Sequence, residues 1–266
     1  MSSIFDGLEN EADILKILRT IEEKYPNPGS KSCKLWKLRQ EPEIAGGNPS
    51  LETLLEKAVA MLAHNKHMPG CYNQIPVASG IVGKNSDRRT CVDLAHWDEN
   101  MDCLRLIELK WRDPKDPNKD PKRVASAVRQ ILRYGAAYLF CRKHKKELSI
   151  QSRSAILAKK VKLEVVAPRS FYICPGSDAF METKKNWSIA RKSLESEAMI
   201  EELKSLELTM TLHARAFPDD FKLPFKSGDE LRRYCDTREL TKKGEEIIHA
   251  FKNLKLVFSD SETVIK

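Results

Sequence analysis

The sequence predicts an α/β fold whose core has the order helix, three strands, helix, strand. Two segments carry apolar residues at the spacing of an amphipathic helix, at residues 50–65 and 121–144. Between them lie three runs of strand-like composition, at residues 72–82, 89–97 and 103–111. A fourth such run follows at residues 162–174. Helices and strands in this order are typical of a sheet covered by helices, so we expect a layered α/β domain.

The N-terminal region is predicted to form one helix followed by a linker. Residues 9–25 repeat apolar side chains at helical spacing, and the PNPG segment at 26–29 ends the pattern. The EPEIAGGNPS segment then leads to Ser50, a residue type that caps helix N-termini. We therefore expect the first core helix to begin directly after Ser50.

The second and third strand runs are predicted to pair as a hairpin. Only the short polar segment DENMD separates them. The segment that follows, RDPKDPNKDPKR, contains three prolines and many charges, so it cannot continue a strand. The next helix is expected to begin only where this segment ends.

Further elements are expected on the C-terminal side of this core. They are a helix at 185–206, a strand at 208–217 and helices at 228–235 and 241–253. The chain is accordingly divided into an N-terminal helical extension (1–48), a core domain (49–217) and a C-terminal helical appendage (218–266).

The composition predicts a basic protein that lies outside membranes. Lys and Arg number 46 against 38 Asp and Glu, a net charge of +8 that suits a polyanionic partner such as nucleic acid. No run approaches the roughly 18 apolar residues needed to span a bilayer. The N-terminus has no cationic start followed by an apolar stretch. We therefore expect no membrane contact and a cytoplasmic location.

Three charged residues of the predicted hairpin are candidates for chemistry. Asp93 lies in its first strand, and Glu108 and Lys110 lie in the IELKW segment of its second. Because side chains alternate along a strand, Glu108 and Lys110 share one face while Leu109 points into the core. A hairpin can lay Asp93 beside that face. Such charges commonly just face water, but two carboxylates that converge away from water repel each other and lose hydration.

A divalent cation would remove this conflict. Mg²⁺ prefers hard oxygen ligands and keeps several waters, so its predicted ligands are Asp93, Glu108 and the main-chain carbonyl of Leu109. We expect Mn²⁺ to substitute for it. The ion would lower the pKa of a bound water and stabilise charge on a phosphorus under attack. Lys110 would orient that water or neutralise the developing charge.

The segment VDLAHWDENMDCLRLIELK, from Val92 to Lys110, resembles the active-site motif of the PD-(D/E)XK nuclease superfamily. Val92 stands where that motif usually has a proline. The resemblance covers residues 50–175. It implies a restriction-endonuclease-like fold, with a mixed central sheet flanked by helices, and magnesium-dependent hydrolysis of DNA.

A second element of the resemblance lies in the helix at 121–144. Gln130 and Tyr134, in RQILRY, are one turn apart and share a helix face. A QxxxY pair here is similar to the RecB and lambda-exonuclease branch, which implies that both residues line the site and help hold the nucleic acid. Amide and phenol groups can both hydrogen-bond phosphate oxygens. An exposed Gln130 and a core Tyr134 with a wet hydroxyl would fit the same pattern.

The resemblance also implies a metal-linked glutamate on the helix that precedes the strands. Glu56 is the predicted residue, and Glu52, one turn earlier, is the alternative. A surface acid that pairs with Lys57 or another base would have the same sequence context.

Together these features predict a magnesium-dependent deoxyribonuclease whose partner is DNA. Two other functions remain open: a catalytically inactive nucleic-acid-binding module of the same fold, and a protein-interaction subunit that docks through residues 185–206. A homodimer would suit double-strand cutting. The sequence leaves endonuclease and exonuclease action, and the strandedness of the substrate, undetermined.

Overall fold

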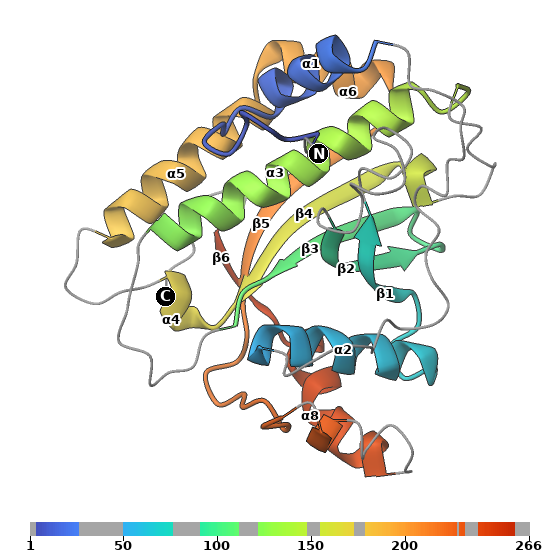
Figure 1. The fold of residues 1–266 in the computed structure, drawn as a ribbon, viewed down its shortest axis with the longest axis vertical. Coiled ribbons are helices and arrows are strands. Elements are labelled where there is room, and N and C mark those ends of the chain that lie inside the picture. The colour runs from blue at the N-terminus through green and yellow to red at the C-terminus, as the bar shows by residue number, and fades with distance from the viewer. Residues whose placement is uncertain are drawn as a thin grey trace.

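The computed structural model describes residues 4–26, 50–76, 91–111, 122–147, 155–172, 179–227, 229–231 and 239–258 (Figure 1). The linker before Ser50, the proline-rich loop after Trp111 and most of the predicted helix at 228–235 lie outside these ranges.

Six strands within the described ranges form one mixed sheet. In spatial order they are β1 (Cys71–Pro76), β2 (Cys91–Asp98), β3 (Cys103–Leu109), β4 (Lys160–Ala167), β5 (Thr209–Ala216) and β6 (Lys255–Phe258). β1, β2 and β3 pair antiparallel, β3, β4 and β5 pair parallel, and β6 pairs antiparallel with β5. The prediction of an α/β fold with a mixed sheet is confirmed.

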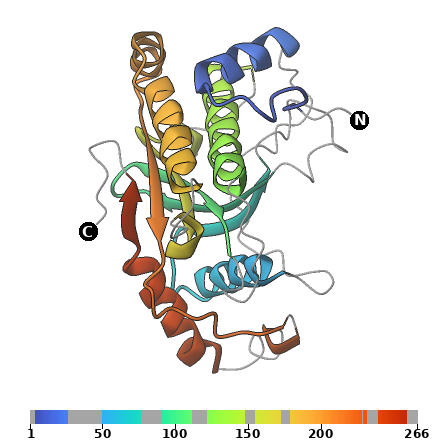
Figure 2. The same cartoon turned by 90° about the vertical axis from the view of Figure 1, so that its left-hand side faces the viewer.

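Helices cover both faces of this sheet (Figure 1, Figure 2). One face carries α3 (Lys122–Lys143), with α1 (Ile14–Lys24), α5 (Ala179–Leu194) and α6 (Glu197–Ser205) on the same side. The other face carries α2 (Leu51–His64) and α8 (Glu239–Lys252). Alternation along β3 sends Leu104 and Leu106 into the core beneath α3, and Ile107 and Leu109 into the core beside α2.

The predicted N-terminal helix is confirmed as α1. It begins at Ile14 because the Asp13 carboxylate caps it, accepting hydrogen bonds from the amides of Leu15 and Lys16 at 2.9 and 3.2 Å. Its buried isoleucines and Leu18 pack into the core beneath α3. At the other end of the chain, the predicted helix at 241–253 is confirmed as α8, and the LKLVF run after it supplies β6.

Two element boundaries were predicted wrongly. The strand predicted at 162–174 ends at Ala167, because Pro168 cannot donate to the ladder and residues Arg169–Tyr172 form the short helix α4. The Tyr172 hydroxyl holds this turn against the sheet by donating to the carbonyl of Val165 at 2.7 Å.

The helix predicted at 185–206 is two helices rather than one. Ser196 ends α5 and caps α6, its hydroxyl accepting a hydrogen bond from the Met199 amide at 3.3 Å. Ile189 on α5 and Ile200 on α6 are partly exposed, while Met199 and Leu203 are buried. None of the helices in the described part of the chain is long and apolar enough to cross a membrane.

Candidate active site

Asp93 and Glu108 meet where the β2–β3 ladder ends. The last paired residues at this end are Leu94 and Ile107, and Asp93 and Glu108 are the next residues on each strand. In place of a further backbone pair, the Asp93 carboxylate accepts a hydrogen bond from the Leu109 amide at 2.8 Å. The hairpin therefore brings both predicted carboxylates together, and the side chain of Asp93 completes the hydrogen bonding of β3.

Glu108 is fully buried and Asp93 is half-buried. Burial raises the pKa of Asp93 to about 6, although the Lys110 charge and the Leu109 amide oppose the rise. Glu108 has no exposed surface, and burial together with the neighbouring Asp93 charge raises its pKa well above the usual range. Oε2 of Glu108 has no hydrogen-bond donor among the described residues. The pair therefore favours a bound proton or a cation over two free negative charges.

Lys110 lies on the same side of β3 as Glu108, as predicted. Its ammonium is 2.6 Å from Oε1 of Glu108 and 3.2 Å from Oε1 of Glu52. Burial alone would lower the pKa of Lys110, but the charges of Glu108, Asp93 and Glu52 outweigh burial and raise it. Lys110 therefore stays an ammonium at neutral pH and acts as a cation rather than as a base.

Of the two glutamates considered on α2, the structure brings Glu52 to Lys110. The second oxygen of Glu52 accepts a hydrogen bond from the Trp111 amide at 3.1 Å, which ties the start of α2 to the end of β3. Glu56, one turn further along, is buried and accepts a hydrogen bond from the Asn73 side chain of β1 at 3.1 Å. The metal-linked role of Glu56 stays a prediction.

Gln130 and Tyr134 share a face of α3, as the helical spacing predicted. The Gln130 amide donates to the Tyr134 hydroxyl at 2.7 Å. Tyr134 is only 4% exposed and its pKa is raised, first by burial and then by the Glu108 charge, which places the phenol near the two carboxylates. Tyr134 thus belongs both to the core and to the edge of the site.

Arg133 is a neighbour of the site that the sequence reasoning missed. Burial lowers the pKa of its guanidinium, while the charges of Tyr134, Glu9 and Glu108 oppose this. Its guanidinium lies over the Phe5 ring at 5.6 Å, and its Nε has no hydrogen-bond partner within the described ranges. No spacing rule selected Arg133, because it contacts the N-terminal segment at residues 4–10, whose position the sequence did not predict.

The donor set suits a magnesium ion better than a transition metal. Among the described residues, no three His, Cys, Asp or Glu side chains come together as a ready metal site. Mg²⁺ needs only one or two carboxylates and fills its remaining positions with water and substrate oxygens. Asp93 and Glu108 supply two carboxylates, and the unpartnered Oε2 of Glu108 is an acceptor that a cation would satisfy.

Comparison with protein families, with curated proteins and with solved structures finds no match to this chain. The geometry of the site therefore carries the functional argument.

Proposed function

We propose that this protein is a magnesium-dependent DNA nuclease of the PD-(D/E)XK superfamily. The observation that carries the proposal is the group formed by Asp93, Glu108 and Lys110 at the end of the β2–β3 ladder, with an ammonium 2.6 Å from a fully buried carboxylate. A buried carboxyl beside a half-buried one, both with raised pKa values, costs stability unless a cation serves them, which is typical of a functional site.

The arrangement around this group supports the restriction-endonuclease-like topology as part of the proposal. From α2 to β4 the chain runs helix, three strands, helix, strand, which is the order the resemblance implies. The three acids and the lysine come from β2, β3 and α2, and α3 supplies Gln130 and Tyr134.

Asp93, Glu108 and the Leu109 carbonyl would hold Mg²⁺, and Mn²⁺ would substitute for it. The bound ion would supply an activated water and charge stabilisation at the phosphorus. Lys110 remains protonated and is held by Glu52, so it is positioned to neutralise negative charge on the phosphate.

Gln130 and Tyr134 would position the DNA strand. Their mutual hydrogen bond orients the amide and the phenol, and both groups can donate to phosphate oxygens. The net charge of +8 favours the approach of a polyanion in a salt-dependent way.

The test is cleavage of DNA by the purified full chain with Mg²⁺ or Mn²⁺. We expect single- or double-stranded DNA to be degraded or nicked, and Lys110→Ala and Asp93→Ala to abolish this. Glu99→Gln is the matched control, because Glu99 is an exposed acid in the turn at the opposite end of the same hairpin. Cleavage that survives both site variants would refute the proposal. DNA binding that ignores both Mg²⁺ and the Asp93 change would instead identify a binding module of the same fold.

A further inference from the structure

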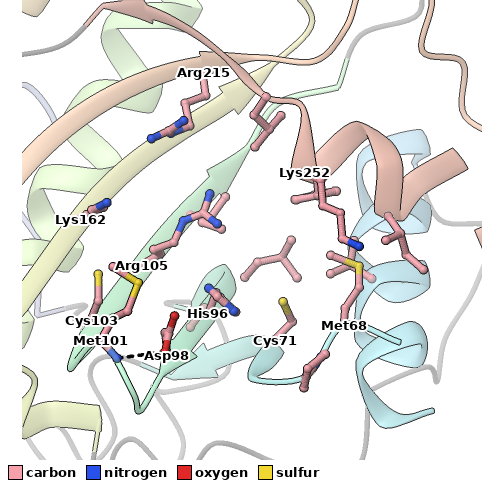
Figure 3. A pocket seen from close by; sticks show the side chains of 18 of the residues that line it. Met68, Cys71, His96, Asp98, Met101, Cys103, Arg105, Lys162, Arg215 and Lys252 are labelled. Carbon is pink, nitrogen blue, oxygen red and sulfur yellow. Dashed lines mark hydrogen bonds between the residues drawn. The ribbon is translucent and has the colours of Figure 1, made fainter. Parts of the chain in front are cut away.

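A pocket of about 460 Å³ lies on the sheet face that carries α2 and α8 (Figure 3). Its floor consists of residues from β2 to β5, and Met68, before β1, and Lys252, at the end of α8, stand at its side. It reaches Asp98 and Cys103, at the hairpin-turn end of β2 and β3. The lining extends along both strands to Leu94 and Ile107, but it does not include Asp93, Glu108 or Lys110, so the pocket is distinct from the candidate active site.

The polar lining of this pocket is mainly cationic. Arg105, Lys162 and Arg215 line it from β3, β4 and β5 (Figure 3). Lys252 adds a fourth cation from α8. The one carboxylate among the lining residues, Asp98, already accepts the Met101 amide at 3.1 Å.

A single buried glutamate serves two of these cations. Glu164 has no exposed surface; its Oε2 accepts from Nε and Nη2 of Arg105 at 3.0 and 2.6 Å, and its Oε1 accepts from Nε of Arg215 at 3.0 Å. Nη1 of Arg105 and both Nη atoms of Arg215 have no hydrogen-bond partner among the described residues. Each arginine side chain is 24% exposed. One carboxylate thus positions two guanidinium groups. The three groups together keep a net positive charge, and the free Nη atoms remain available as hydrogen-bond donors.

A third cation of the pocket also lacks a polar partner. Within the described residues, the half-buried Lys162 ammonium forms no ion pair or hydrogen bond. The free N–H groups of the two arginines and this ammonium are donors that suit an anion.

The rest of the pocket is apolar. Leu94 and Ile107 are apolar residues of its floor, and Ile248, Phe251 and Leu254, on α8 and just after it, form an apolar wall. A volume of this size is within the range of sites for small organic molecules, which are largely apolar with a few fixed polar groups. The ligand that fits therefore has an anionic head and an apolar or aromatic body. Two guanidiniums and an ammonium from three adjacent strands suit the several oxygens of a phosphate monoester.

We propose that this pocket binds a small organic phosphate of the size of a nucleoside 5′-monophosphate, with its phosphate held by Arg105, Lys162 and Arg215. The body of the ligand packs on the apolar wall beside α8. This site is independent of the proposed nuclease chemistry, since it uses neither the carboxylate pair nor its cation.

The test is isothermal titration calorimetry of the full chain in EDTA-containing buffer, which prevents magnesium-mediated binding at Asp93 and Glu108. The probes are the four common nucleoside 5′-monophosphates, the corresponding nucleosides and inorganic phosphate. We expect at least one monophosphate to bind, its nucleoside to bind at least tenfold more weakly, and inorganic phosphate to bind more weakly than the monophosphate.

Two variants probe the pocket without touching the Glu164 ion pairs. Lys162→Gln removes a partner-free ammonium, and Met101→Glu places a negative charge on a lining residue that is 59% exposed. We expect each to weaken monophosphate binding by about tenfold with an unchanged melting temperature. Lys192→Gln is the control, because Lys192 is exposed on α5 across the sheet. The proposal is overturned if no monophosphate binds, if nucleosides bind equally well, or if Lys192→Gln weakens binding as much as Lys162→Gln.

Discussion

Glu108 and Glu164 are both completely buried glutamates on neighbouring strands, and their surroundings act on them in opposite directions. Two guanidinium groups outweigh the burial of Glu164 and lower its pKa. Glu108 faces Asp93, and its pKa is raised. The first carboxylate is held by two guanidinium groups, whereas the second has one ammonium, that of Lys110, and a neighbouring carboxyl group. Burial and charge at single residues thus separate a structural acid from a candidate catalytic one.

We expect Asp93→Asn to stabilise the metal-free protein at pH 7. The folded-state pKa of about 6 exceeds the ordinary value of 3.8, so the folded state binds the proton more tightly. The free energy of unfolding therefore falls as pH rises from about 4 to about 6. Removing the charge should recover on the order of 1–3 kcal/mol, measured by urea unfolding. Mg²⁺ should raise the melting temperature of the wild type but not of Asp93→Asn; equal shifts in both would contradict a metal role for Asp93.

Cleavage should lose activity as pH falls through about 6, because Asp93 must be ionised to hold the ion. Protons and Mg²⁺ compete for the same carboxylates, so raising the Mg²⁺ concentration should move this acid limb to lower pH. No alkaline limb from Lys110 is expected near neutrality, because its pKa is raised. The measurement is initial rate against pH at two Mg²⁺ concentrations, and an acid limb that does not move would argue against metal binding by this pair.

At the scale of elements, α2 links the end of β3, where the candidate site lies, to the edge strand β1. The Ser50 hydroxyl accepts from the Thr53 amide at 3.2 Å and fixes the first turn of the helix. That turn carries Glu52 to Lys110 and Trp111. The next turn carries Glu56 to Asn73 on the edge strand β1. Glu52 and Glu56, one turn apart on the same helix, therefore bond to residues at two different strands.

Comparison of Glu52→Gln with Glu56→Gln should separate the roles of these two acids. We expect Glu52→Gln to reduce the cleavage rate about tenfold at saturating Mg²⁺, because Lys110 loses one of the two carboxylates that hold it. The Mg²⁺ concentration for half-maximal rate should change little. If Glu56 is a metal ligand, as the sequence predicted, Glu56→Gln will instead raise that concentration. Rates measured across a Mg²⁺ titration distinguish the two, with urea unfolding as the check on folding.

Local sequence patterns predicted most of the helices and strands, but not the ends that tertiary contacts determine. Local patterns predicted α1, α2, α3 and the β2–β3 hairpin, because periodicity, the Ser50 cap and the DENMD turn are all local. The end of β4 was missed because the Tyr172 hydroxyl reaches carbonyls on two strands, which is a tertiary contact. The break at Ser196 was missed because charged residues continue on both sides of it.

At the scale of the whole molecule, the buried ion pairs of Glu164 connect β3, β4 and β5 across the sheet centre. No local pattern predicts these ion pairs, because Arg105, Glu164 and Arg215 are far apart in the chain and converge only through the parallel pairing of their strands. The group at the candidate active site was predictable in contrast, because Asp93, Glu108 and Lys110 all lie on or next to a single hairpin. The choice between Glu52 and Glu56 required the docking of α2, which no local pattern specifies.

Glu164→Gln should destabilise the whole fold, because it leaves two guanidiniums without their shared carboxylate. We expect a loss on the order of 2–4 kcal/mol, discounted because both arginines are partly exposed. The pKa of Glu164 is lowered, so its contribution is present above pH 4.5 and is lost as pH falls through the folded-state pKa. Urea unfolding at pH 7 is the measurement. Glu108→Gln is the matched comparison and should not destabilise the metal-free protein. Similar losses in both variants would contradict the view that Glu164, unlike Glu108, stabilises the fold.

The hairpin that carries the two carboxylates is also the most local pairing in the sheet, whereas β3–β4 and β4–β5 join strands separated by whole helices. Short-range pairings close first during folding, since little chain entropy opposes them. A newly made chain would thus bring its mutually repelling acids together before α3 and β4 exist to shield them. The ion that we assign to chemistry would then also act as an early folding aid.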